Sequence, residues 1–75
     1  MKSISKFNVG DKIEVSLIDL SSYQKERMLS IGITCGAVIK VIRFGPKKNL
    51  IVFDVRGAMV ALREDELKFI YGKKV

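Results

Sequence analysis

Short apolar runs, several of them followed by a turn that contains glycine, divide this sequence and limit what it can fold into. The first run alternates strictly, so that Ile13, Val15 and Leu17 lie on one side of an extended chain. This alternation is typical of a half-buried β-strand, and no apolar run approaches the ~20 residues that a membrane-spanning helix needs. The pattern therefore predicts a small, mainly β protein without membrane insertion.

Four further runs rich in Val, Ile, Leu and Phe have the length of strands. The connections Gly45–Asn49 and Arg56-Gly57 have the composition of hairpin turns. The run 37–44 is apolar on both faces, which predicts a central strand. Residues 1–8 are expected to fray or to pair at a sheet edge, and residues 72–75 to form a tail. The predicted strands are Lys12–Leu17, Ala37–Phe44, Leu50–Val55, Ala58–Leu62 and Leu67–Tyr71.

One helix is predicted, over about Ser21–Ile31. Ser21 and Gln24 have the spacing of a capping box, and Gly32 suits the left-handed residue that ends a helix. Met28 and Ile31 share a helix face, and a helix of about eleven residues is too short to be stable unless this face packs on the sheet.

The charged stretch Arg63–Glu66 is too short for a core element and is predicted to form a 3₁₀ turn before the last strand. Five or so strands, one inserted helix and this turn predict a small, partly closed SH3-like barrel, because closure hides sheet edges. Residues 1–75 contain no linker or repeat and form a single domain.

Candidate catalytic and metal-binding residues are scarce. The chain has no histidine, the commonest general base and metal ligand near neutral pH, and no phosphate-binding loop. We therefore predict no catalytic residue, no cofactor and no enzyme activity. The densest acidic group is Glu64, Asp65 and Glu66. It is interpreted as a solvated turn neutralised by basic neighbours, and a divalent-metal site there is kept as the weaker alternative.

The single cysteine, Cys35, cannot form an internal disulfide. A lone reduced thiol fits a cytoplasmic protein better than a secreted one. A reactive thiol would need an exposed, electropositive setting that the sequence does not establish, so we interpret Cys35 as a small loop residue.

A net charge of +6 favours an acidic partner, or simply a well-solvated surface. Two basic residues lie on the predicted helix away from its buried face, and two lie at a hairpin tip. Most aromatic residues fall within strand patterns, so they are expected in the core and not as platforms for stacking bases. We expect no nucleic-acid ligand, although a basic nucleic-acid-binding barrel is kept as the alternative. The predicted partner-binding residues are Lys25, Arg27, Lys47 and Lys48.

The segment from Glu26 to Val41 resembles the signature of the FeoA family, ferrous iron transport protein A. The family pattern runs roughly Arg-Leu-x-x-Met-Gly-Ile-x-Pro-Gly-x-x-Ile-x-Val, and from Arg27 this chain reads RMLSIGITCGAVIKV. Met28 replaces leucine, which nearly conserves volume, and Cys35 replaces proline, which leaves that turn less preorganised. The resemblance extends to Gly10 and to the segment 61–66, and covers residues 7–71.

The resemblance implies an SH3-like barrel in the cytoplasm and an accessory role in bacterial or archaeal ferrous iron uptake. It implies a FeoB-type permease with a cytoplasmic G-protein domain as the partner, at the inner face of the membrane. The same module forms the C-terminal domain of iron-dependent repressors of the diphtheria-toxin-repressor type. Because the chain begins with Met1 and no helix-turn-helix precedes the barrel, we expect a free-standing protein. A weak homo-oligomer, formed through an exposed strand or an apolar patch, is left open.

Overall fold

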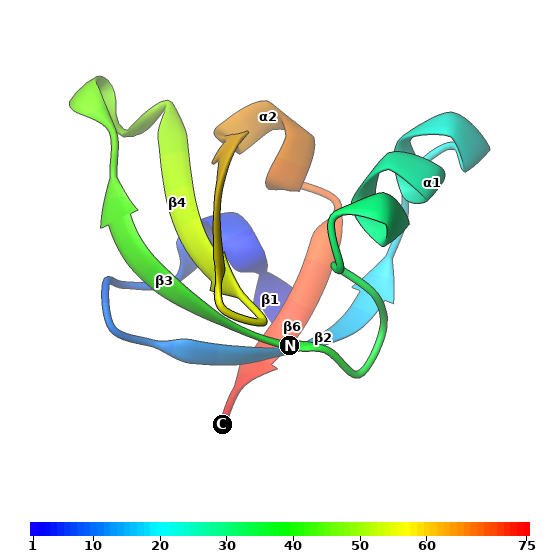
Figure 1. Ribbon diagram of the computed structural model, residues 1–75, viewed down its shortest axis with the longest axis horizontal. Helices are drawn as coiled ribbons and strands as arrows, with labels where there is room; N and C mark the ends of the chain where they lie inside the picture. The colour runs from blue at the N-terminus through cyan, green and yellow to red at the C-terminus, as the bar shows by residue number, and fades with distance from the viewer.

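A curled antiparallel sheet of six strands surrounds one apolar core (Figure 1). The computed structural model describes the backbone of residues 1–75 and every side chain except that of Lys48, so this predicted partner residue lies outside the described side chains. The strand order is β1-β6-β2-β3-β4-β5. The strands are β1 (Lys2–Ser3), β2 (Lys12–Ile18), β3 (Val38–Phe44), β4 (Leu50–Val55), β5 (Ala58–Arg63) and β6 (Ile70–Lys74).

The mainly β class, the helix and the short turn before the last strand agree with the prediction, but the barrel is not closed. The sheet has two ends, β1 and β5, and these strands do not pair with each other in the described backbone. The strand beyond the five predicted is β1, because the N-terminal lead-in pairs with β6 at Lys2 and Ser3. This lead-in also buries Ile4 and Phe7 in the core.

A β-bulge in β2 changes which of its residues face the core. The register with β6 shifts between Val15 and Leu17. Ile13 and Val15 are buried as predicted, but Leu17 is 43% exposed and Ile18 is buried instead. The prediction for Leu17 was wrong because the extra residue of a bulge reverses the alternation that follows it.

The predicted central strand is confirmed, because β3 lies between β2 and β4. It buries one face only, since Val41 lies in the core while Val38 is 50% exposed. The prediction of a C-terminal tail needs correction. The predicted tail belongs to β6, which pairs with β2 as far as Lys74. Gly72 allows the two strands to approach closely at this point, because a Cβ atom there would clash with the backbone oxygen of Glu14 at 2.6 Å. A glycine and two lysines indicate a tail in the sequence, yet the backbone pairing needs no apolar side chains.

The helix α1 (Ser22–Ser30) begins and ends close to the predicted positions. Its first turn is capped by Ser21, whose Oγ accepts a hydrogen bond from the backbone N–H of Gln24 at 3.4 Å. Gly32 follows the helix with φ of +92°, the left-handed conformation that glycine adopts without a steric penalty. Among the nine residues of α1, all of them described, only Met28 is buried.

The predicted single turn before the last strand is present as α2 (Glu64–Leu67), although its geometry is α-helical and not 3₁₀. The backbone N–H of Arg63 donates to Glu66 Oε2 at 3.1 Å, which satisfies the start of this turn. Leu67 is fully buried and fixes α2 on the core. The 3₁₀ turns of the chain lie elsewhere, at Ile4–Lys6 and Pro46–Lys48.

The single buried residue of α1 predicts how this helix is held. We expect Met28→Ala to lower the free energy of unfolding by about 2–5 kcal/mol, because it removes a fully buried side chain and leaves a cavity. The neighbouring Leu29 is 62% exposed, so Leu29→Ala is a matched control that leaves stability nearly unchanged. Urea unfolding monitored by circular dichroism measures both, and equal losses for the two variants would contradict this account.

Candidate functional site: the surfaces around α1

The helix α1 stands out from the curled sheet and has two differently built sides (Figure 1). On one side, a groove of about 380 Å³ lies between α1, the end of β2 and the segment that follows the helix. Most of its lining is apolar, and Lys25 and Glu26 are its charged residues. The complete lining is Ile18, Ser22, Lys25, Glu26, Leu29, Ile33, Thr34 and Cys35.

This groove exists because α1 is anchored at one point. Successive helix residues are about 100° apart, so burying Met28 turns Leu29 away from the core and toward solvent. The left-handed Gly32 then reverses the chain, which brings Ile33 into the core and leaves Cys35 exposed beside Leu29. A concave apolar surface with a few polar groups is typical of a binding site.

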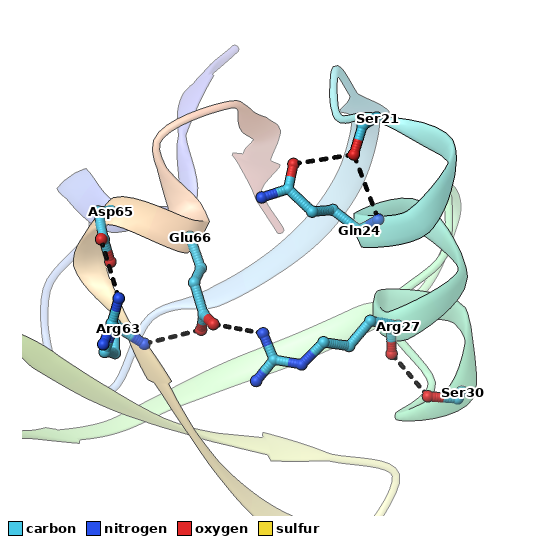
Figure 2. Close-up of polar contacts among 7 residues, drawn as sticks. All are labelled: Ser21, Gln24, Arg27, Ser30, Arg63, Asp65 and Glu66. Carbon is cyan, nitrogen blue, oxygen red and sulfur yellow. Dashed lines mark hydrogen bonds and ion pairs between the residues drawn. The ribbon is translucent and has the colours of Figure 1, made fainter.

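The other side of α1 is tied to α2 by a chain of charged groups, shown in Figure 2. The guanidinium Nη1 of Arg27 donates to Glu66 Oε1, and the second oxygen of this carboxylate accepts from the backbone of Arg63. The Arg63 side chain in turn donates to Asp65 Oδ2 at 3.3 Å. The helix and the short turn are therefore joined through one carboxylate.

This ion pair perturbs both of its members. The hydrogen bond from Arg27 lowers the pKa of Glu66, and the backbone N–H of Arg63 lowers it further. The same hydrogen bond raises the pKa of Arg27. Because its charge is already matched by Glu66, Arg27 is better suited to orient α1 than to attract a partner.

A third surface is a polar depression of about 510 Å³ beside the β3–β4 hairpin. Lys47, Arg63 and Lys68 supply its positive charge, and Glu64 and Asp65 its negative charge. The predicted partner residues are thus spread over three surfaces: Lys25 lines the groove, Arg27 pairs with Glu66, and Lys47 lines this depression. The structure does not bring Lys25 and Lys47 into one contact surface.

The three acidic residues of α2, Glu64, Asp65 and Glu66, point to different surroundings. Glu66 turns toward Arg27, whereas Glu64 and Asp65 line the polar depression. Within the described part of the chain, no three Asp, Glu, Cys or His residues are grouped so that they could hold a metal ion. Two of the three carboxylates are paired with basic groups, Glu66 with Arg27 and Asp65 with Arg63.

Sequence reasoning missed the groove itself. It selected charged residues, whereas the groove is built mainly from Ile18, Leu29 and Ile33. One signal was present, because Leu29 flanks the buried face of the predicted helix and has no place on that face. The described residues also contain no helix with the length and apolar character that crossing a bilayer requires.

Comparison with known proteins decides the family. The FeoA domain model matches residues 2–74. The chain belongs to the FeoA family. Its structure is similar to that of the FeoA protein from Chlorobium tepidum, with 26% identity, a TM-score of 0.90, and coverage of 97% of this chain and 70% of that one. None of the curated proteins compared matches the sequence significantly.

Other solved structures share the SH3-like fold at lower identity. A FeoA-like protein from Clostridium acetobutylicum is 23% identical, with a TM-score of 0.88 and coverage of 99% of this chain and 86% of that one. A manganese-dependent transcriptional repressor is 20% identical, with a TM-score of 0.89, and the match covers 99% of this chain but 41% of the repressor. At these identities the likeness shows the fold alone.

The lowered pKa of Glu66 predicts a pH dependence of stability. The ionised carboxylate stabilises the fold fully above its ordinary pKa of 4.5, and this contribution is lost as the pH falls through the lower pKa of the folded state. We expect Glu66→Gln to unfold at a lower temperature than the wild type at neutral pH, by a small margin because the pair is partly exposed. The margin should disappear in strong acid.

Thermal unfolding across this pH range measures the difference between the two proteins. Asp65→Asn is the control, because both members of its ion pair are more than half exposed and should contribute little. A margin for Glu66→Gln that persists unchanged in strong acid would contradict the role given to the ionised carboxylate.

Proposed function

We propose that this FeoA-family chain is a non-enzymatic accessory protein of ferrous iron uptake that binds a FeoB-type permease at its cytoplasmic side. The observation that carries the proposal is the apolar groove on the outer side of α1. Family membership supports the link to iron transport, and the groove supports action by protein binding. Nucleotide hydrolysis and ion passage are then tasks of the permease.

The groove fits a short apolar segment of a partner protein. Leu29 offers an exposed aliphatic contact, and the buried Ile18 and Ile33 contribute apolar lining beneath it. Lys25 and Glu26 add one charge of each sign at the same place. Such a combination of an apolar centre and charged neighbours is common where an amphipathic segment docks.

The two basic residues of α1 have different tasks in this proposal. Lys25 lines the groove directly and is available to steer an acidic partner. Arg27 acts through Glu66, by holding the groove-bearing helix at a fixed angle to the sheet. Lys47 lies in a separate depression and is not needed for docking in the groove.

Calorimetric titration against the full-length cognate permease in nanodiscs tests this function, with nucleotide absent, with GDP and with a GTP analogue. We expect Leu29→Ser to weaken binding roughly tenfold or more, as for a residue at the centre of an interface. Val38→Ser is the matched control, since Val38 is 50% exposed on β3 and does not line the groove. Biolayer interferometry on the same nanodiscs should show a lower association rate for Lys25→Glu and an unchanged rate for Lys47→Glu.

Absence of binding in all three nucleotide states would reject the proposed partner. Binding that Leu29→Ser and Val38→Ser weaken equally would reject the groove as the contact surface and leave the partner in place. Circular dichroism spectra of the variants show whether each of them is folded, so that a loss of binding can be assigned to the surface.

A second function, binding of nucleic acid, is favoured by one observation. Two depressions are rich in basic side chains. Asp11 lines the first and the next residue in the chain, Lys12, lines the second. One is lined by Lys2, Lys73 and Lys74 among others, and the second by Lys12, Lys40 and Arg56 among others. Affinity for DNA or RNA that falls steeply with salt would support this function, and no binding at low salt would dismiss it.

A further inference from the structure

The strand β5 has one unpaired edge. It is the last strand of the sheet and pairs only with β4, through six consecutive residue pairs without a bulge. The side chains along it are accessible, since Met59 is 61% exposed and Ala58 and Ala61 are also exposed. The yellow strand at the centre of Figure 1 is β5.

The turn before β5 fixes which backbone groups point outward. Arg56 and Gly57 both have positive φ, 54° and 89°, which is the type I′ turn of a two-residue hairpin. In this turn Val55 and Ala58 exchange hydrogen bonds, and every second pair along the ladder does the same. The backbone N–H and C=O groups of Met59 and Ala61 therefore point away from β4.

No hydrogen bond within the described residues uses these outward groups. At the next outward position the N–H of Arg63 is already occupied, because it donates to Glu66 Oε2. The outer edge of β5 thus presents two donors and two acceptors, at Met59 and Ala61, over an extended segment.

This edge also lacks the features that normally prevent an exposed strand from pairing with another molecule. Residues 58–62 contain no charge, no proline and no bulge. The opposite end of the sheet is different, because β1 is two residues long and carries Lys2. An apolar, regular and accessible edge is a site for the addition of another strand.

We propose that the outer edge of β5 pairs with the same edge of a second copy of this chain, antiparallel and centred on Val60. In this register Met59 of each copy lies opposite Ala61 of the other. Each of these two pairs exchanges two backbone hydrogen bonds, which gives four in all. Val60 meets its own copy in the intervening pair, where the side chains are closest. A register centred on Ala61 would instead need the N–H of Arg63, which Glu66 holds.

The charges at the ends of β5 fit a second copy better than an unrelated strand. The register centred on Val60 places Arg56 near Glu64 of the second copy, twice by symmetry, because these positions are equally far from Val60. Arg63 is the one charged residue between them, and in this register it lies opposite the uncharged Gly57 of the second copy. Val60 is already packed against the core on the same face as Phe53, so the pairing would extend the apolar core across the two-fold axis.

The net charge gives this association a recognisable salt dependence. Each copy carries +6, so the two copies repel each other at low ionic strength and associate more strongly when salt screens the repulsion. Docking of an acidic partner on this basic protein would respond to salt in the opposite direction.

Cysteine cross-linking in a Cys35→Ser background tests the register. Val60→Cys should form an intermolecular disulfide on mild oxidation, because the opposed Cα atoms of such a pair lie about 4.5 Å apart, within reach of a disulfide. Met59→Cys is the matched control. It lies on the same edge and is exposed, but its copy is a diagonal neighbour about 7–8 Å away. We expect Val60→Cys to cross-link several-fold faster than Met59→Cys.

Sedimentation velocity over a range of concentrations tests the association itself. We expect a dimer whose fraction rises with concentration and with salt. Ala61→Pro removes an outward N–H without removing a hydrogen bond to β4, so it should give a folded monomer, whereas Ala61→Ser keeps the N–H and should still dimerise. If Ala61→Pro does not fold, the cross-linking rates decide the question.

Two results would overturn the proposal. The first is a wild-type protein that stays monomeric at the highest concentration and salt, which would leave the edge for a strand of another protein. The second is equal cross-linking of Val60→Cys and Met59→Cys, which would mean that any association uses another surface or register.

Discussion

One small apolar core holds β2 to β6 and both α-helices, and each of these helices reaches it through a single buried side chain. Among the residues of α1 only Met28 is buried, and α2 contributes only Leu67. Strands supply most of the remaining core, centred on residues such as Phe53. A chain of this size cannot bury much more, so the outer faces of its helices stay available for contacts with other molecules.

The position of α1 depends on two contacts of different kinds. Met28 supplies the apolar anchor, and the ion pair between Arg27 and Glu66 joins the helix to α2. The apolar anchor supplies most of the energy, whereas the ion pair is partly exposed and mainly fixes direction. Together they keep one side of α1 against the molecule and turn Leu29 toward the groove that we propose as the docking site.

The open sheet gives the molecule a second surface for contacts. A closed barrel would have no strand edge, but here β5 ends the sheet with the outward backbone groups of Met59 and Ala61 unpaired within the described residues. The groove beside α1 is built from side chains, while the β5 edge offers backbone groups. The proposed docking in the groove and the proposed strand pairing at β5 would therefore use different contacts.

The sequence by itself determined the β class, the helix with its Ser21 cap and Gly32 stop, both hairpins and the resemblance to the FeoA family, because these depend on local patterns. Only the tertiary structure decided that Leu17 faces solvent and that residues 72–74 belong to β6, because bulges and strand pairing are set by distant segments. It also separated Lys25, Arg27 and Lys47 onto different surfaces and formed the groove at Leu29. The groove is lined by residues from separate elements, β2, α1 and the segment after α1, and local sequence patterns do not show that these elements pack side by side.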